Sequence, residues 1–384
     1  MATSVSRPII QLTIARRLLR VNWPLLGLVC LITGVGISTL YSVAGGSFTP
    51  WADKHAIRLL IGLGIILGMA VVPLRVWMTL AYPAYMLALA TLALVPLLGA
   101  DVMGARRWIR LGEFSLQPSE IMKLALVAAL ARYYQWLPPE KISRPLWVGL
   151  PLLAIAAPVV LVLKQPDLGT AVLFACVGLG LMFLAGVNIL YFGAGAATVV
   201  ALAPVIWNHL HDYQRRRLLT FLDPDRDPLG AGYHILQSKI AFGSGGLIGK
   251  GYMKGTQGQL NFLPEKQTDF IFTMLAEESG FVGAVALMGL YGLLILTLLA
   301  MAIACRSQFA RLLVVGPAIT IFIYTSVNMS MVMGLVPVVG VPLPLVSYGG
   351  TAMLTIFAGL GLAMCGYVHR NQQFRRDDLG ALAS

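Results

Sequence analysis

Charged residues are scarce in this sequence. They make up only 11% of its 384 residues, whereas 58% of the residues are hydrophobic. A soluble domain normally carries roughly a quarter charged residues. The scarcity therefore excludes an ordinary soluble protein and indicates a chain that lies mainly within a membrane.

The sequence also lacks the common signatures of metal and nucleotide sites. Its four cysteines stand singly, and its five histidines form no H-E-x-x-H motif, which argues against a disulfide framework or a built-in zinc site. The run GLIGKG at residues 246–251 departs from a Walker A motif, because Ser244 replaces the first glycine and Gly251 follows the lysine. No G-x-S-x-G nucleophile motif is present either.

Long hydrophobic runs are what the sequence has instead. They predict an all-α integral membrane protein, a single polytopic domain over residues 1–384 with about ten transmembrane helices, each near the length needed to cross the hydrocarbon core. The expected spans are residues 23–41, 57–72, 77–98, 121–133, 146–163, 170–187, 189–207, 270–305, 312–336 and 351–368.

The basic residues fall between these runs. The formal net charge is +12, but the charges form no single stripe, so we expect membrane topology and not nucleic acid to explain them. An even number of spans places both termini on one side. The segments on that side hold more Lys and Arg than the short loops opposite, which predicts cytoplasmic termini.

This topology puts one large loop, residues 209–269, outside the cytoplasm and before the eighth helix. Residues 212–228 of the loop are charged and turn-forming, and residues 243–258 are rich in glycine. Glycine permits a close approach of the backbone to a ligand, so the second stretch suits a loop that lines a cleft. A flexible linker is the alternative interpretation.

Asp269 ends the polar stretch NFLPEKQTD, just before a long apolar run. Its carboxylate is therefore expected near the outer interface. Thr273 and Glu277 follow at i+4 and i+8, which would place Glu277 on the same helical stripe about 12 Å deeper. The alternative for Asp269 is a negative charge that complements the positive N-terminal end of the helix dipole.

Ionisable residues inside the predicted spans are the next candidates, since charges there are costly and face the bundle interior or a polar cavity. They are Glu120, Lys123, Glu277 and Glu278. Glu120 and Lys123 are three residues apart and can neutralise each other, in a structural or a functional pair. Asp167, in KQPDLGTA, is expected to cap the helix that follows it.

Arginines on the outer side oppose the usual charge bias and need a reason. Arg106, Arg107 and Arg110 surround Trp108 in GARRWIRLG. Guanidinium groups suit diphosphate oxygens, and tryptophan suits a lipid tail at the interface, so a lipid-diphosphate ligand would explain both. Anchoring to lipid headgroups is the alternative.

Several longer strings resemble the SEDS family of bacterial cell-wall proteins (shape, elongation, division, sporulation), and its elongation branch in particular. The resemblance covers nearly the whole chain and implies ten helices, cytoplasmic termini and a large extracytoplasmic loop. The strings are GARRWIRLG, QPSEIMKLA, KQPDLGTA, HILQSKIAFGSGGLIGKG, GTQGQLNFLPEKQTDFIFTMLAEESGFVG and PVVGVPLPLVSYGGT.

The resemblance implies a peptidoglycan glycosyltransferase in the bacterial cytoplasmic membrane. It would polymerise lipid II, a disaccharide-pentapeptide on undecaprenyl diphosphate, during cell elongation, with its active site facing the exterior. Asp269 takes the place of the family's essential aspartate and would act as the general base. Candidate substrate-binding residues are Arg106, Arg107, Trp108, Lys239, Lys250 and Gln257. Candidate cavity-shaping residues are Glu120, Lys123, Asp167, Glu277 and Ser347.

The resemblance also implies partners: a class B penicillin-binding protein that cross-links the glycan, and other membrane proteins of the elongation complex. It leaves a divalent metal, Mg²⁺ or Mn²⁺, open and identifies no ligands for it. Gln267 and Asn261 depart from relatives that carry histidine and an acidic residue there. Two other functions stay open, a lipid II flippase and a non-catalytic scaffold for a transpeptidase.

Overall fold

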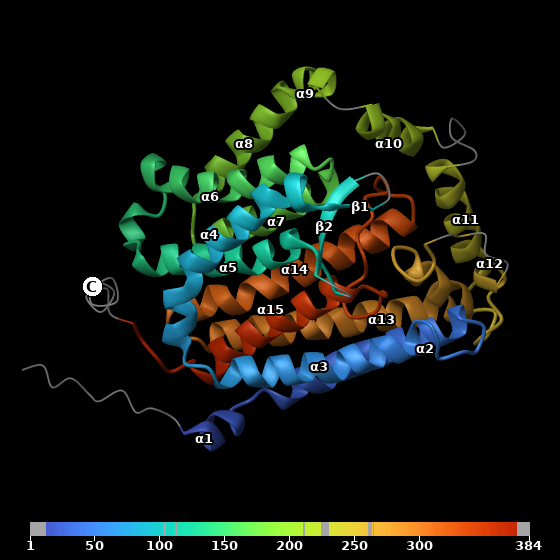
Figure 1. Ribbon diagram of the computed structural model, residues 1–384, viewed down its shortest axis with the longest axis horizontal. Coiled ribbons are helices and arrows are strands. Elements are labelled where there is room, and N and C mark those ends of the chain that lie inside the picture. Colours follow the sequence, from blue (N-terminus) through green and yellow to red (C-terminus); the bar gives the residue numbers. More distant parts are fainter. Residues whose placement is uncertain are drawn as a thin grey trace, which may run out of the picture.

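The computed structural model describes residues 13–374 except 103–104, 112–113, 210–211, 224–229, 260–262 and 264. Helices dominate it and pack into one bundle (Figure 1). A short helix, α1 (Ile14–Leu18), precedes the first long one. The helices at the predicted spans are α2 (Trp23–Val43), α3 (Ala52–Val71), α4 (Leu74–Leu98), α5 (Pro118–Trp136), α6 (Pro145–Lys164), α7 (Leu168–Leu184), α8 (Ile189–Ala201), α9 (Ala203–His209), α13 (Ile271–Ile303), α14 (Gln308–Val332) and α15 (Gly350–Val368).

The all-α membrane fold is confirmed, because nine of the ten predicted spans each fall on one helix and the tenth falls on two. Seven of these helices are long and apolar enough to cross a membrane: α2, α3, α4, α6, α13, α14 and α15. The helices α7 and α8 are apolar but shorter, and α5 carries the Glu120–Lys123 pair. Because only seven of the described helices have the length and the apolar composition that a span requires, the total of about ten crossings stays a prediction.

The predicted span 189–207 divides into α8 and α9. Pro204 is the second residue of α9, and a proline there has no backbone N–H with which to continue the hydrogen-bond ladder from α8. With α10 (Asp212–Leu222), these helices arch away from the rest of the bundle (Figure 1). No residue of α8 is buried.

A small antiparallel sheet was not expected from the sequence. It comprises β1 (Ala100–Val102), β2 (Ala105–Leu111) and β3 (Phe114–Leu116), in the order β1-β2-β3. Ile109 pairs with Leu116, and Trp108 pairs with Ala100. Residues 105–111 of the GARRWIRLG stretch therefore form the middle strand of a small sheet between α4 and α5.

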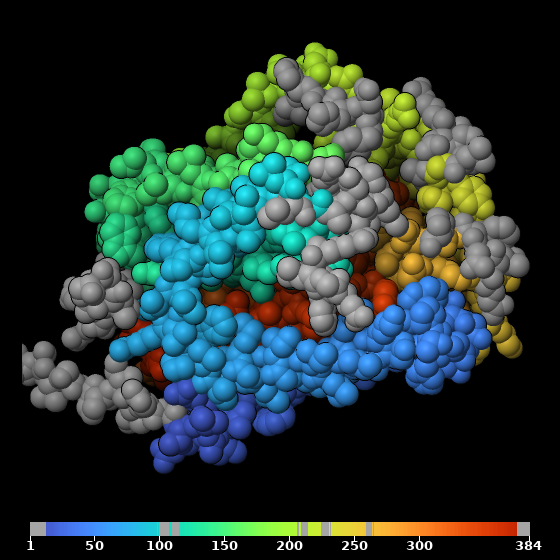
Figure 2. Space-filling model, in the orientation of Figure 1, coloured from blue at the N-terminus to red at the C-terminus, as the bar shows by residue number. Residues whose placement is uncertain are grey.

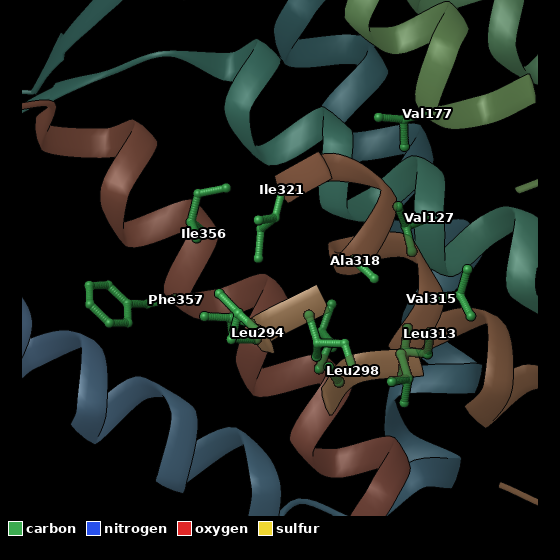
Figure 3. Packing of buried hydrophobic residues seen from close by; sticks show 14 of the residues in the cluster. Val127, Val177, Leu294, Leu298, Leu313, Val315, Ala318, Ile321, Ile356 and Phe357 are labelled. Atoms are coloured by element: carbon green, nitrogen blue, oxygen red, sulfur yellow. The ribbon is translucent and has the colours of Figure 1, made fainter. Parts of the chain in front are cut away.

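The core is centred on α14. Of the residues in its most apolar stretch 72% are buried, against 22% of those in the corresponding stretch of α3. Apolar side chains of α5, α7, α13, α14 and α15 meet there (Figure 3). The outer helices α2 and α3 form a continuous band on one face (Figure 2). Packing is close where α3 meets α15, since a Cβ at Gly62 would lie 2.3 Å from the Phe357 ring.

The large predicted loop contains helices of its own. These are α10, α11 (Ala231–Ser244) and α12 (Thr256–Gln259), of which α11 and α12 lie at one end of the bundle and α11 packs against α13 (Figure 1). The helix α13 is interrupted at Gly280, whose φ of 66° and ψ of −164° are not helical. At its other end α13 begins at Ile271. Asp269 therefore lies before the helix, and the expected helical stripe from Asp269 to Glu277 does not include the aspartate.

Candidate functional site

Asp269 lies in a turn, half-buried, directly before α13. Backbone hydrogen bonds from Thr268 and Phe270 to the Glu265 carbonyl, at 3.1 and 3.3 Å, close this turn. Phe270 is the N-cap residue of α13, and no side chain caps that helix. Asp269 is therefore held in position by the turn and not by a capping hydrogen bond.

The turn is also supported by α14 and by the segment that connects α14 to α15. Asn328 Nδ2 donates to the Asp269 carbonyl at 2.9 Å and to the Val341 carbonyl at 2.6 Å. Ser347 Oγ donates to the Thr268 carbonyl at 2.6 Å. Gly340 has a φ of +76°, and a Cβ there would lie 3.3 Å from Asp269 Oδ2, so this glycine leaves the carboxylate its space.

Burial raises the pKa of Asp269 to about 6, and the nearby negative charge of Glu265 adds to this effect. The positive charge of Arg217 acts in the opposite direction. Arg217, on α10, donates from Nη1 to the Val338 carbonyl at 3.2 Å. A carboxylate with a pKa near 6 is suited to accept a proton at neutral pH.

Glu277, by contrast, is fully buried and saturated with hydrogen bonds. Its Oε1 accepts from Lys250 Nζ at 2.6 Å, from the Thr256 N–H and hydroxyl at 2.9 Å each, and from the Gln257 N–H at 3.2 Å. The carboxylate thus fastens the glycine-rich loop to α13. Lys250 and Gln257, predicted to bind substrate, meet at this carboxylate.

Arg107 lies against the start of α7. Its Nε donates to the Gln165 carbonyl at 3.3 Å, its Nη2 donates to the Pro166 carbonyl, and its Nη1 lies 3.6 Å from Asp167 Oδ2. Asp167 caps α7 through the N–H and hydroxyl of Thr170, as predicted. Trp108 is half-buried. The side chain of Arg106 lies outside the described residues.

Two arginines belong to elements that pack against the segment that carries Gly340. A Cβ at Gly169, at the start of α7, would lie 2.3 Å from Val339 Cγ1, which brings the Arg107–Asp167 loop against this segment. Arg217 reaches the same segment from α10, at the carbonyls of Val338 and Val339. Arg217 therefore bonds to the segment that adjoins Asp269, and Arg107 belongs to the loop that packs against this segment.

Glu120 and Lys123 form a buried ion pair, with Nζ 2.8 Å from Oε1. Lys123 also donates to the Tyr324 hydroxyl. Glu120, Tyr324 and Ser347 line a small cavity that extends to the start of α15. The pair predicted from the i,i+3 spacing is thus present and borders a cavity that reaches the Ser347 support of the Asp269 turn.

Lys239 is exposed on α11, apart from these groups. Its side chain packs beside Gly334, where a Cβ would lie 2.2 Å from Lys239 Cε. Three supports of the site were missed from the sequence: Arg217, Asn328 and Gly340. Gly340 and Arg217 stood in strings singled out for other reasons, PVVGVPLP and QRRRL, but nothing in the sequence distinguishes Asn328 from the other polar residues of its helix.

A divalent metal ion, which the sequence leaves open, has few candidate ligands among the residues that the structure describes. No group of three His, Cys, Asp or Glu side chains converges among them. Glu265 and Asp269 are near enough to interact electrostatically, which makes a pair of carboxylates. Asn261, considered above as a ligand position, lies outside the described residues.

These features define a multi-pass helical membrane protein with a half-buried carboxylate beside a polar loop. A family model described as a cell cycle protein, FtsW/RodA/SpoVE, matches residues 15–372. The chain belongs to this family, which confirms the resemblance to SEDS proteins.

Individual relatives agree with this assignment. The chain is 45% identical over 330 residues to the peptidoglycan glycosyltransferase MrdB of Escherichia coli K12, covering 85% of this chain and 88% of that protein. It is 36% identical over 306 residues to MrdB of Helicobacter pylori J99, covering 79% of each.

Solved structures show the same fold. One is a chain of a peptidoglycan synthase complex that coordinates polymerization and crosslinking, with a TM-score of 0.80 and 35% identity over 92% of this chain and 99% of that one. Another is the rod shape determining protein RodA of Thermus thermophilus, with a TM-score of 0.69 and 32% identity over 92% and 98%.

Proposed function

We propose that this protein is a peptidoglycan glycosyltransferase of cell elongation that polymerises lipid II, with Asp269 as the general base. Both MrdB relatives described above are named as peptidoglycan glycosyltransferases, which supports this class of reaction. The observation that carries the residue assignment is the half-buried carboxylate of Asp269, whose pKa burial raises to about 6. A group of this kind is ionised at neutral pH and basic enough to accept a proton from a sugar hydroxyl.

The proposed reaction is a single displacement at the anomeric carbon of the donor. Asp269 takes the proton of the acceptor hydroxyl as the oxygen attacks, the bond from the anomeric carbon to the diphosphate oxygen breaks, and the configuration inverts. Undecaprenyl diphosphate leaves with the bonding electrons. We assign the stabilisation of its developing negative charge to Arg107 and Arg217, whose anchoring contacts lie near the Gly340 segment.

We place the protein in the cytoplasmic membrane with both termini in the cytoplasm and Asp269 on the outer side. The positive-inside bias supports this orientation. A class B penicillin-binding protein is the proposed partner, supported by the likeness to a chain of a complex that coordinates polymerization and crosslinking. Other membrane proteins of the elongation complex are expected to join it.

The test is polymerisation of labelled lipid II by the purified chain, with and without a chelator. Asp269→Asn keeps the size of the side chain but cannot accept the proton, so glycan formation should stop. Glu140→Gln, an exposed acid in the connection between α5 and α6, is the matched control and should retain activity. Full activity of Asp269→Asn would refute the assignment, and loss of activity with the chelator would show that the reaction needs a divalent ion.

A lipid II flippase is the second candidate, favoured by the buried Glu120–Lys123 pair that borders a cavity. It predicts movement of labelled lipid II between the leaflets of reconstituted vesicles in the absence of polymer. Vesicles that make glycan and show no exchange between leaflets would exclude it.

A further inference from the structure

The glycine-rich loop is built into the break in α13. Beyond Gly280, the N–H groups of Phe281 and Val282 donate to the carbonyls of Gly246 and Leu247, at 2.9 and 3.1 Å. Before the break, the carbonyls of Glu277 and Glu278 accept from the N–H groups of residues 250 and 251, at 3.0 Å each. Four backbone groups that the kink takes from the helix are thus satisfied by the loop.

Glycine is required where the glycine-rich loop meets the break in α13. Gly249 has a φ of +87°, and a Cβ there would lie 2.1 Å from the Glu278 carbonyl oxygen. A Cβ at Gly280 would lie 2.3 Å from the Gly249 nitrogen. Since real Cβ atoms do not come so close to backbone, these glycines fix the loop against α13 and determine where its tip points.

The tip of the loop is apolar and exposed. Leu247 is 71% exposed and Ile248 is 83% exposed. Both adjoin Phe281 and Val282, the first residues of α13 after the break, which are 58% and 62% exposed. Together these four side chains form one outward-facing apolar surface, which we name the tip patch. Contiguous apolar surface of this kind marks a contact with membrane or protein.

The length of α13 indicates the depth of the tip patch relative to the hydrocarbon core of the membrane. Residues 281–303 would rise about 34 Å as a regular helix, close to the ~30 Å thickness of a hydrocarbon core, so Phe281 lies near one boundary of that core. The neighbouring helix α2 agrees, because Ser42, next to its last residue, donates to Glu278. Tyr252, just beyond the tip, bonds to the Ser38 carbonyl of α2 at 2.9 Å.

We propose that Leu247 and Ile248 insert into the lipid leaflet at the loop end of the bundle and anchor the glycine-rich loop in the membrane. Acyl chains are the occupant that fits the tip patch, because the patch continues the outward face of a membrane-crossing helix at the boundary of the hydrocarbon core. Backbone outside a helix is tolerated at this depth only when its polar groups are satisfied by protein. The four hydrogen bonds to α13 meet this condition for the carbonyls of Gly246 and Leu247 and for the N–H groups of residues 250 and 251.

The anchor has a consequence for the loop behind it. Lys250, Thr256 and Gln257 all bond to the Glu277 side chain, so the stretch that follows the tip is tied to the bundle. With its apolar end in the lipid, the glycine-rich loop is held at both ends and cannot swing freely into water. This inference does not depend on the proposed reaction.

The test places a fluorophore at the tip of the full-length protein. Ile248→Cys is labelled with the environment-sensitive dye NBD in a chain with Cys30→Ala and Cys176→Ala; Cys305 and Cys365 are buried and stay unlabelled. The labelled protein is reconstituted in vesicles of phosphatidylethanolamine and phosphatidylglycerol. Lys254→Cys, an exposed polar position of the same loop, is the matched control, and Leu247→Cys is the second tip position.

Doxyl-labelled phospholipids should quench the dye at residues 247 and 248 several-fold more strongly than aqueous iodide does, and the order should reverse at residue 254. Equal access of iodide to residues 248 and 254 would refute the anchor. Protection of the tip from both quenchers would also refute it, since this result would mean that protein covers the patch. Circular dichroism and thermal melting of each labelled chain show that it is folded.

Discussion

The proposed role of Asp269 predicts a specific dependence of the polymerisation rate on pH. With a pKa of about 6, the carboxyl is about nine-tenths ionised at pH 7 and about one-tenth ionised at pH 5. An aspartate with its ordinary pKa near 4 would still be about nine-tenths ionised at pH 5. If the ionised form is the base, the rate should fall roughly tenfold between its plateau and pH 5.

Two neighbouring charges allow the origin of this pKa to be tested. Burial is the main cause of the rise, and the negative charge of Glu265 adds to it, so Glu265→Gln should lower the apparent pKa of the rate profile. The positive charge of Arg217 opposes the rise, so Arg217→Gln should raise the apparent pKa. The assay is the initial rate of glycan formation from labelled lipid II between pH 5 and pH 8, with folding checked at each pH.

The same shift has a stability consequence of known sign. The folded pKa lies above the unfolded value, so the folded state disfavours the ionised form, and the stability associated with this group falls as the pH rises from about 4 to about 6. A shift of about two units corresponds to about 3 kcal/mol. Asp269→Asn should therefore raise the melting temperature at pH 7.5 while it abolishes activity.

Three outcomes would contradict this reasoning. The first is a rate that stays flat down to pH 5. The second is a shift of the apparent pKa in the same direction in Glu265→Gln and Arg217→Gln. The third is a lower melting temperature for Asp269→Asn at pH 7.5, which would show that the carboxylate stabilises the folded protein.

Three further predictions concern the supports of the site. Asn328→Leu removes the donor to the Asp269 and Val341 carbonyls and should cost about 1–3 kcal/mol in the free energy of unfolding, measured by denaturation in detergent. Lys123→Met should cost about 3–5 kcal/mol because it leaves Glu120 buried and unpaired, and the double variant Glu120→Gln/Lys123→Met should recover much of this loss; a double variant less stable than Lys123→Met would contradict it. Gly249→Ala should lower the melting temperature, because the residue has a positive φ and no room for a Cβ, whereas Gly243→Ala, with nothing within 4 Å of the added Cβ, should not.

The helices could be predicted from the sequence because their signal is local. A run of about 20 apolar residues has few alternatives to a membrane-crossing helix, and the break at Pro204 has a local cause as well. The Glu120–Lys123 pair and the Asp167 cap were predictable for the same reason, since both depend on spacings of three residues within one element.

The contacts between distant segments could not be predicted in this way. Asn328 reaches Asp269 across 59 positions, and its sequence neighbours give no indication of that. The break in α13 at Gly280 is stabilised by a loop about 30 residues earlier, so the run from Ile271 to Ile303 looks like one long helix until the loop is placed against it. The small sheet was missed because GARRWIRLG does not show the regular alternation of apolar and polar residues that indicates a strand, so it was interpreted by its charges.

Glu277 shows why spacing alone is a weak guide to chemistry. Sequence position put Asp269 and Glu277 on one helical stripe, with Glu277 the deeper of the two carboxylates. The structure gives Glu277 four hydrogen-bond donors and complete burial, whereas the hydrogen bond from Asn328 that supports Asp269 goes to its backbone carbonyl. A carboxylate satisfied on all sides is poorly placed to exchange protons with a substrate, and one that is half-buried and held by its backbone keeps its oxygens available. Glu277→Gln should therefore loosen the glycine-rich loop and lower the melting temperature without moving the apparent pKa of the rate profile; a shifted pKa in this variant would show that Glu277 takes part in the proton transfer.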